Sequence, residues 1–152
     1  MLNTNKIKRR DYEIITTMIH NDSTVLDLGC GDGSLLQHLT KERNVSGYGV
    51  EKDHRNVLAS LSNGVNVIQS DLEQGLSGFA DSAFDYVILS LTLQAVHETE
   101  TIMNEMLRVG SEVIVTFPTL DCGDIAYKFF WDKHRYQKSC HINGMTRQMF
   151  TY

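Results

Sequence analysis

Residues 26–35 read LDLGCGDGSL and place three glycines at alternate positions, directly after an apolar run. Glycine lets the backbone turn with positive φ, and it removes the side chain where a ligand must come close. A helical pattern begins just after Gly29, Gly31 and Gly33, so the free N–H groups of that helix would face the same ligand. The stretch therefore predicts a ligand-binding loop between a strand and a helix.

The spacing of these glycines differs from that of a dinucleotide-binding loop. The dinucleotide fingerprint reads G-x-G-x-x-G, and its third glycine would fall at Ser34 in this chain. An NAD-binding oxidoreductase is therefore disfavoured. A carboxylate at Glu51 would in addition repel the 2′-phosphate of NADP.

Two acidic residues close the next two predicted strands. Glu51 ends the run YGVE about 20 positions after the glycine loop, where a carboxylate can accept hydrogen bonds from ribose hydroxyls. Asp71 ends VIQSD and can accept a hydrogen bond from an amine such as adenine N6, while Leu72 offers the ring an apolar face. Each acid taken alone is better explained as a helix cap or a solvated strand end. Together with the glycine loop, they predict one nucleoside pocket.

The elements that must position these residues alternate along the chain. Apolar and β-branched runs predict five strands, at STVLDLG, VSGYGVE, VNVIQSD, AFDYVILSL and SEVIVTF. Helical spacing separates them, and one helix has Asp53 as its N-cap and Asn63-Gly64 as its end. This order predicts an α/β fold: a Rossmann-like, open, mostly parallel sheet with helices on both faces. Ligands of such sheets bind at the carboxyl ends of the strands.

Length and composition fit a single domain over residues 1–152, with 41% hydrophobic and 22% charged residues. No apolar run has the length of a membrane span, and MLNTNKIKRRDY lacks the apolar stretch of a secretory signal. A net charge of −5 without a long basic block argues against an obligate nucleic-acid partner. The cysteines at 30, 122 and 140 form no C-x-x-C pair, which predicts a reduced, cytoplasmic protein without a structural metal site.

The motifs resemble those of a known family. VLDLGCGDG, followed by Glu51 and Asp71, resembles the Rossmann-like (class I) S-adenosylmethionine-dependent methyltransferases. QSDLEQGL and LSLTLQAV are more specific, and with RRDYEII, GYGVEKD and VIVTFP they resemble the MetW family of methionine biosynthesis proteins. This narrower resemblance covers approximately residues 9–118.

The resemblance implies a cofactor and the residues that hold it. The cofactor would be S-adenosylmethionine, or S-adenosylhomocysteine after transfer, with the loop around the methionine part, Glu51 at the ribose, and Asp71 and Leu72 at the adenine. The ammonium group would lie near Asp27 or Asp32. The cofactor-binding residues implied in this way are Asp27, Gly29, Cys30, Gly31, Gly33, Glu51, Lys52, Asp71, Leu72 and Ser90. The resemblance also implies homoserine O-acyltransferase as a partner.

Whether the chain is a catalyst stays open at this stage. Methyl transfer requires alignment of the acceptor and, for some acceptors, removal of a proton. His97 is the candidate base, because it follows the fourth predicted strand, although it also fits as a polar residue at a loop-to-helix junction. The alternative is a non-catalytic, S-adenosylmethionine-binding partner that activates the acyltransferase.

The last part of the chain departs from the family pattern. The segment DIAYKFFWDKHRY fits an amphipathic helix, and residues 119–152 are expected to be a divergent or incomplete C-terminal segment, so that the sheet would be truncated after strand five. Strand five, Val113 to Phe117, would then expose an edge that pairs readily with another chain. We therefore expect that edge either to form a homodimer or to be covered by the segment around Phe129, Phe130 and Trp131.

Overall fold

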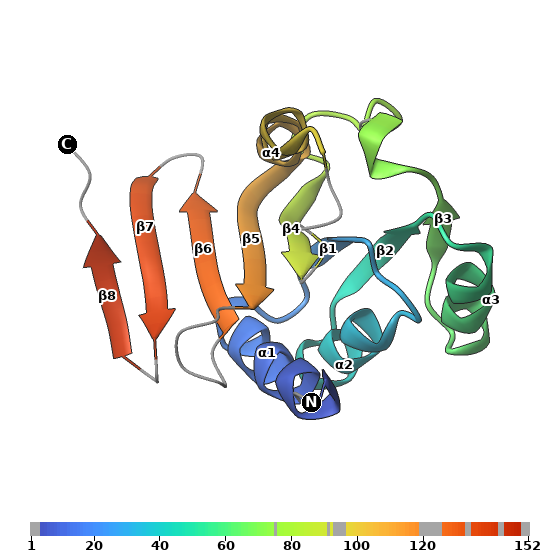
Figure 1. Ribbon diagram of the computed structural model, residues 1–152, viewed down its shortest axis with the longest axis horizontal. Helices are drawn as coiled ribbons and strands as arrows, with labels where there is room; N and C mark the ends of the chain where they lie inside the picture. The colour runs from blue at the N-terminus through green and yellow to red at the C-terminus, as the bar shows by residue number, and fades with distance from the viewer. Residues whose placement is uncertain are drawn as a thin grey trace.

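The computed structural model describes residues 4–74, 76–90, 92, 97–118, 126–132, 135–142 and 145–149, with side chains described for residues 11–74, 76–90, 92 and 97–116. In this part of the chain the strands form a single sheet with the order β3-β2-β1-β4-β5-β6-β7-β8 (Figure 1). The five strands β1 to β5 are parallel to one another. Their bounds are β1 Thr24–Leu28, β2 Ser46–Glu51, β3 Val67–Gln69, β4 Phe84–Ser90 and β5 Gly110–Pro118.

The helices connect these strands as the periodicity predicted. They are α1 Thr4–Met18, α2 Ser34–Arg43, α3 His54–Ser62, the single 3₁₀ turn η1 Leu72–Gln74, and α4 Thr99–Val109. The predicted cap of α3 is confirmed, because Asp53 Oδ1 accepts hydrogen bonds from the backbone amides of Arg55 at 2.8 Å and Asn56 at 3.2 Å. Asn63 is the C-cap, and Gly64 follows with φ 74°.

Alternating strand residues bury two separate hydrophobic clusters, one on each face of the sheet. Leu26, Leu28 and Val87 pack with the α4 residues Ile102 and Met106. On the opposite face, residues of β1, β4 and β5 pack with residues of α1 and α2, which lie side by side in Figure 1. Since Asp27 alternates with Leu26 and Leu28, its side chain points toward the face that α1 covers.

The order of the strands reverses between β1 and β4. From β1 the chain continues to β2 and β3 on one side, and it then returns to β4 and β5 on the other. Loops that leave the carboxyl ends of two such neighbouring strands diverge, and a crevice opens between them. The glycine loop after β1 and the residues after β4 border this crevice.

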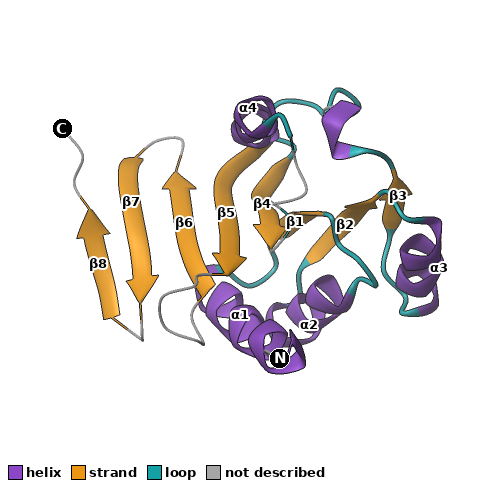
Figure 2. Cartoon of the chain, viewed as in Figure 1, coloured by secondary structure: helices purple, strands orange, loops and turns teal. Residues whose placement is uncertain are grey.

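The prediction of an amphipathic helix in the C-terminal part of the chain is wrong. Residues 126–132 form strand β6, and β7 Arg135–Ile142 and β8 Met145–Met149 continue the sheet as antiparallel neighbours (Figure 2). The run YKFFW is rich in aromatic residues, which favour strands over helices. The sheet therefore does not stop at strand five.

Strand β6 also decides what covers the edge of β5. The two strands pair antiparallel, with Val113 opposite Trp131 and Val115 opposite Phe129. The expectation that the segment around residues 129–131 covers this edge is confirmed. Both edges of β5 are paired within the chain, so pairing of that edge in a homodimer is not available in this structure.

The segment between η1 and β4 covers part of the sheet without forming a long helix. Leu76, 2% exposed, packs into the α4-side cluster, and Phe79 contacts Phe84 edge to face. Arg108 of α4 holds the segment, because its guanidinium donates to the Leu76 and Phe79 carbonyls at 2.9 Å and to Asp81 at 2.8 Å. Within the described residues, no helix combines the length and apolar character that crossing a membrane requires.

Candidate functional site

The glycine loop takes the left-handed conformations that its sequence predicted. Gly29, Gly31 and Gly33 have φ values of 68°, 57° and 76°. A Cβ atom at Gly33 would lie 2.9 Å from the Val65 side chain and 3.1 Å from Ser60 Oγ, so this glycine serves the packing of the loop onto α3 and the residues that follow it. A Cβ atom at Gly31 would meet nothing within 4 Å, so the backbone at Gly31 faces open space. Gly31 is therefore the position where a ligand can approach the loop most closely.

Polar side chains from α3 and β2 hold this loop in place. Ser60, fully buried, donates to the Gly31 carbonyl at 2.8 Å, and Asn63 Nδ2 donates to the Asp32 carbonyl at 2.8 Å. The amide of the same residue, Gly31, donates to Glu51 Oε2 at 2.9 Å. The loop is thus fixed by the folded chain itself, without a ligand.

Two cavities meet at the glycine loop, with Gly29, Gly31 and Thr92 in the walls of both. Cavity I, about 190 Å³, lies between the loop and α1 and is also lined by Tyr12, Asp27, Cys30, Asp32, Leu35 and Ser90. Cavity II, about 410 Å³, lies toward β2 and β3 and is also lined by Glu51, Lys52, Asp71, Leu72, Glu73 and His97. Together they have the size that small-molecule ligands occupy.

Asp27 is a strongly perturbed acid in the site. Its side chain lines cavity I, is only 2% exposed and has no hydrogen-bond partner among the described residues. Burial, with additional repulsion from Asp11 and Glu51, raises the pKa of Asp27 to about 8. A buried carboxyl group that lines a cavity and lacks a partner is a ready acceptor for a cationic or N–H-bearing ligand group.

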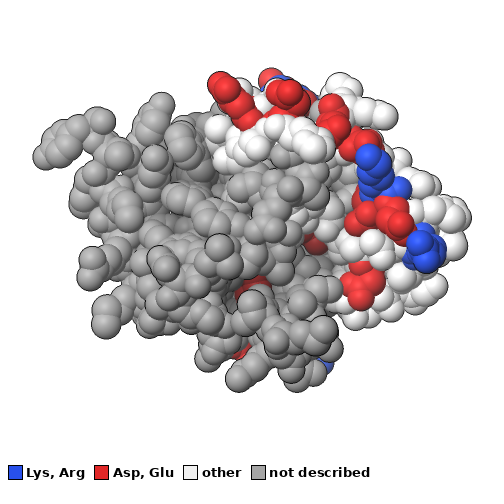
Figure 3. Space-filling model, in the orientation of Figure 1, with Lys and Arg blue, Asp and Glu red and all other residues white. Residues whose placement is uncertain are grey.

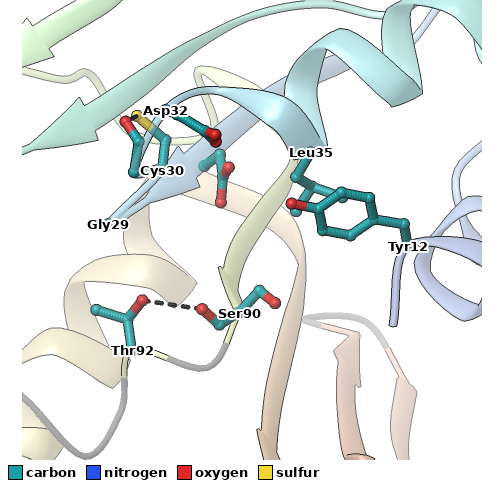
Figure 4. Close-up of a pocket in the computed structure, with 9 residues that line it drawn as sticks. Tyr12, Gly29, Cys30, Asp32, Leu35, Ser90 and Thr92 are labelled. Carbon is teal, nitrogen blue, oxygen red and sulfur yellow. Dashed lines mark hydrogen bonds between the residues drawn. The ribbon is translucent and has the colours of Figure 1, made fainter. Parts of the chain in front are cut away.

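Helix α1 contributes a wall of cavity I. Tyr12 lies across the cavity from the glycine loop, and Figure 4 shows its ring beside Leu35 and opposite Ser90 and Thr92. Burial, followed by the charges of Asp27, Asp32 and Asp11, raises the pKa of Tyr12 to about 12, so its hydroxyl stays protonated. At the far wall the Thr92 hydroxyl donates to the Ser90 carbonyl at 2.9 Å.

A buried carboxylate lies directly behind Ser90. Asp11 Oδ2 accepts hydrogen bonds from the Ser90 hydroxyl at 2.6 Å and from the Thr116 hydroxyl at 2.9 Å. Asp11 and Thr116 are each 1% exposed. Through Asp11, helix α1 is thereby attached to the carboxyl ends of β4 and β5.

Ion pairs and hydrogen bonds organise the rim of cavity II. Lys52 Nζ lies 2.5 Å from Asp71 Oδ2, and this hydrogen bond lowers the pKa of Asp71 and raises that of Lys52. The His97 side chain is 89% exposed, and its Nε2 lies 3.9 Å from Glu73 Oε1. On the described part of the molecular face seen in Figure 3, acidic side chains are interspersed with basic ones.

The structure brings together nine of the ten residues that the resemblance implied for the cofactor. Asp27, Cys30 and Ser90 line cavity I, Glu51, Lys52, Asp71 and Leu72 line cavity II, and Gly29 and Gly31 line both. Gly33 lines neither cavity and supports the loop from behind. The candidate base His97 lines cavity II, at a rim position away from Asp27 and Ser90.

Sequence reasoning missed Asp11, Tyr12, Thr92, Ser60 and Asn63 as parts of the site. A signal existed for Asp11, because it shares a helical face with Ile15 and Ile19, and a charged residue on a buried face needs a partner. The predicted absence of a metal site remains a prediction. Among the described residues, no three His, Cys, Asp or Glu side chains are grouped so that they could hold a metal ion.

Comparisons with known proteins agree with this geometry. A family profile described as "Methionine biosynthesis protein MetW" matches residues 9–137. The chain is 45% identical over 116 residues to the bifunctional methionine biosynthesis protein MetXA/MetW of Rhodopirellula baltica (strain DSM 10527 / NCIMB 13988 / SH1), and the match covers 71% of this chain but 19% of that protein. The chain thus spans about a fifth of the length of this relative.

Solved structures share the fold. The YcgJ protein of Bacillus subtilis is 19% identical with a TM-score of 0.64, and the match covers 72% of this chain and 50% of that one. A SAM-dependent methyltransferase of Aquifex aeolicus is 20% identical with a TM-score of 0.61, covering 80% of this chain and 77% of that one. The predicted Rossmann-like fold of class I methyltransferases is therefore confirmed.

Proposed function

Because the chain belongs to the MetW family of methionine biosynthesis proteins, we propose that it binds S-adenosylmethionine in cavities I and II. The adenosine part would occupy cavity II and the methionine part cavity I, so that the ligand passes over Gly31. The observation that carries the proposal is the continuous site around Gly31, where open space at the glycine separates a buried, unpartnered Asp27 from the Glu51 carboxylate.

The residues of cavity II suit a nucleoside. Glu51 Oε2 accepts from the Gly31 amide and Oε1 from the Asp53 amide, at 2.9 and 2.8 Å, and a carboxylate has further lone pairs for two ribose hydroxyls. Leu72 supplies an apolar surface for a base, and Asp71 supplies an acceptor beside it. S-adenosylmethionine has the hydroxyls and the exocyclic amine that this arrangement would bind.

The residues of cavity I suit the charged end of the same molecule. Asp27 and Asp32 can accept hydrogen bonds from an α-ammonium group, and the Gly31 backbone leaves room for the chain between the sulfonium and the α-carbon. The cofactor supplies an electrophilic methyl group on its sulfonium. Ser90 and Tyr12, on opposite walls, would then orient an acceptor, while His97 would lie at the nucleoside end of the site.

Two roles for the bound cofactor follow from different observations. The fold and the joined cavities favour transfer of the methyl group to a small-molecule acceptor. The fused Rhodopirellula relative, which has a MetXA and a MetW part in one chain, favours a non-catalytic role as a partner that activates homoserine O-acyltransferase. The distinction depends on acceptor chemistry, and we propose methyl transfer first because Ser90 lines cavity I, where it could contact an acceptor.

Calorimetric titration of the purified chain with S-adenosylmethionine, S-adenosylhomocysteine and NAD tests the binding proposal. We expect binding of one or both adenosyl compounds and none of NAD. Binding of NAD alone, or of no compound, would overturn the proposal. Displacement by adenosine, but not by inosine, would show that the site recognises the exocyclic amine, and loss of this difference in Asp71→Ala would assign the recognition to Asp71.

A second experiment separates the two roles. The chain is incubated with S-adenosylmethionine carrying a labelled methyl group, first with a metabolite extract and then with the homoserine O-acyltransferase of its own organism. Label in a small molecule supports methyl transfer. Faster acyl transfer in the presence of the chain, without transfer of label, supports the partner role.

A further inference from the structure

The charged side chains that line cavity I all have the same sign. Asp27 and Asp32 lie in its wall, and no lysine, arginine or histidine does so among the described residues. Asp11 adds a third carboxylate, hydrogen-bonded to the hydroxyl of Ser90, which lines the cavity. Cavity I is therefore a small, partly enclosed space surrounded by acidic groups.

The position of Asp11 is held firmly. Two hydroxyl groups, from β4 and β5, donate to the same carboxylate oxygen, and the Thr116 hydroxyl lies 3.0 Å from Ser90 Oγ as well. Because Asp11 is 1% exposed, solvent screens its charge little. The charge of Asp11 would therefore act on a ligand bound in cavity I, on the other side of Ser90.

We propose that cavity I selects S-adenosylmethionine over S-adenosylhomocysteine by charge, with Asp11 and Asp27 as the residues that set this preference. The inference rests on the proposed function. The two compounds share the nucleoside and the amino acid groups, and they differ by one methyl group and its positive charge on sulfur. Any difference in affinity therefore reports on the surroundings of the sulfur, while the shared contacts cancel.

The protonation of the site agrees with this selection. Burial and the neighbouring Asp11 and Glu51 raise the pKa of Asp27 to about 8, so at neutral pH most of this carboxyl is protonated while no cation is near. A cation in cavity I would favour the ionised form and release the proton.

Two other titratable groups that line cavity I stay protonated at neutral pH. Burial raises the pKa of Tyr12 from α1, and that of Cys30 from the glycine loop, to about 12, so both are neutral. Asp32 accepts hydrogen bonds from the Ser34 amide at 3.1 Å and from its hydroxyl at 2.6 Å. Loss of the methyl group would remove the sulfonium charge, so that only the α-ammonium group, which both compounds carry, would still compensate these acidic groups.

A preference of this kind would let the protein respond to the methylated form of the cofactor. A catalyst benefits when the product does not bind competitively, and an activating partner would report how much S-adenosylmethionine is available. In both roles the same pair of carboxylates would decide whether the site is filled.

The test is the ratio of two dissociation constants, measured by calorimetry for S-adenosylhomocysteine and S-adenosylmethionine. For the unchanged protein at pH 7.5 we expect a ratio of roughly ten or more. Asp11→Asn retains an oxygen that accepts from Ser90 and Thr116 but removes the charge, so it should lower the ratio toward one with little loss of S-adenosylhomocysteine affinity. Asp27→Asn should also lower the ratio toward one. Glu42→Gln, at an exposed position of α2, is the matched control and should leave the ratio unchanged.

The unchanged protein provides a second measurement that does not depend on the folding of a variant. Its ratio should rise with pH between about 6 and 8.5, as Asp27 becomes easier to ionise. A ratio near or below one at every pH overturns the inference and leaves the proposed function standing. A ratio above ten that Asp11→Asn and Asp27→Asn do not alter also overturns it. If neither compound binds, the proposed function fails, and the inference fails with it.

Discussion

The Gly31 amide donates a hydrogen bond to Glu51 Oε2 at 2.9 Å, which joins the glycine loop to the carboxyl end of β2. Glu51 Oε1 accepts from the Asp53 amide at the beginning of α3. One carboxylate thereby fixes the loop, the end of the strand and the start of the next helix. Its remaining lone pairs face cavity II, so the group that would bind a ribose is oriented by backbone contacts before any ligand arrives.

Replacement of Glu51 should therefore weaken binding of every adenosyl compound. Glu51→Ala removes the acceptor for the ribose hydroxyls, and the loss should be about 1–3 kcal/mol of binding free energy. Because both S-adenosylmethionine and S-adenosylhomocysteine contain the ribose, calorimetry should show the same loss for both.

Glu51→Gln separates orientation from charge, because the amide oxygen can still accept from Gly31. Its affinity should fall between those of Glu51→Ala and the unchanged protein. Unchanged affinity in Glu51→Ala would show that the ribose is held elsewhere.

Two glycines with nearly the same backbone conformation allow strain to be distinguished from ligand approach. Gly31 and Gly64 have φ values of 57° and 74°, and a Cβ atom at either would meet nothing within 4 Å. An alanine at each position should cost about 1–2 kcal/mol of unfolding free energy through its left-handed conformation. Only Gly31→Ala places its methyl group in the site, so only this variant should lose most S-adenosylmethionine affinity, by calorimetry. Equal affinity in Gly31→Ala and Gly64→Ala would mean that the ligand does not pass over Gly31.

The scaffold could be predicted from the sequence because its signals are local. Apolar runs and helical spacing identified the five parallel strands and their helices, and Asp53 and Asn63 marked the ends of α3 correctly. Since parallel strands end at a common edge, residues at strand ends were also placed together correctly, which is why Glu51 and Asp71 share a cavity.

The missed features depend on contacts between distant segments. Asp11 reaches Ser90 and Thr116 across 79 and 105 positions of sequence, and no local pattern records such pairs. Ser60 and Asn63 look like ordinary residues near the end of a helix, yet they hold the glycine loop. Strand β6 was misassigned because the polar residues in YKFFWD also fit helical spacing, and pairing with β5 decides between the two.

The buried acid Asp27 should make stability depend on pH. Its pKa is about 8 in the folded protein and 3.8 as the reference value for an exposed group. Between these values the folded chain binds more protons than the unfolded chain, so unfolding free energy falls as pH rises, by at most about 1.4 kcal/mol per pH unit. The unfolding free energy of Asp27→Asn, measured by urea unfolding, should fall less between pH 5 and pH 8 than that of the unchanged protein. Parallel pH curves for the two proteins would exclude this role of Asp27.

The Lys52–Asp71 ion pair should compete with the adenine amine. Lys52 is 73% exposed, so its pairing with Asp71 contributes little to folding but occupies the carboxylate that the base would use. Lys52→Met keeps an apolar stem and frees Asp71, so affinity for adenosine and S-adenosylmethionine should increase roughly threefold or more, without a change in melting temperature. In Asp71→Asn, which lacks a charged partner for Lys52, the further change Lys52→Met should have little effect. Weaker binding in Lys52→Met alone would instead assign the ammonium itself to the ligand.

Arg108 should matter for the fold and not for the ligand. Its guanidinium, 29% exposed, donates to two backbone carbonyls and to Glu105 and Asp81, and so it ties residues 76–81 to α4 where no long helix covers the sheet. Arg108→Ala leaves those carbonyls without their donor and frees Glu105, whose other hydrogen bond is to the Leu76 amide at 3.1 Å. The thermal midpoint should therefore fall by roughly 3–6 °C.

Arg55→Ala, on the exposed side of α3, is the control and should leave the midpoint unchanged. Residues 76–81 lie outside both cavities, so Arg108→Ala should keep its S-adenosylmethionine affinity below its melting temperature. A large loss of affinity would show that this segment also shapes cavity II.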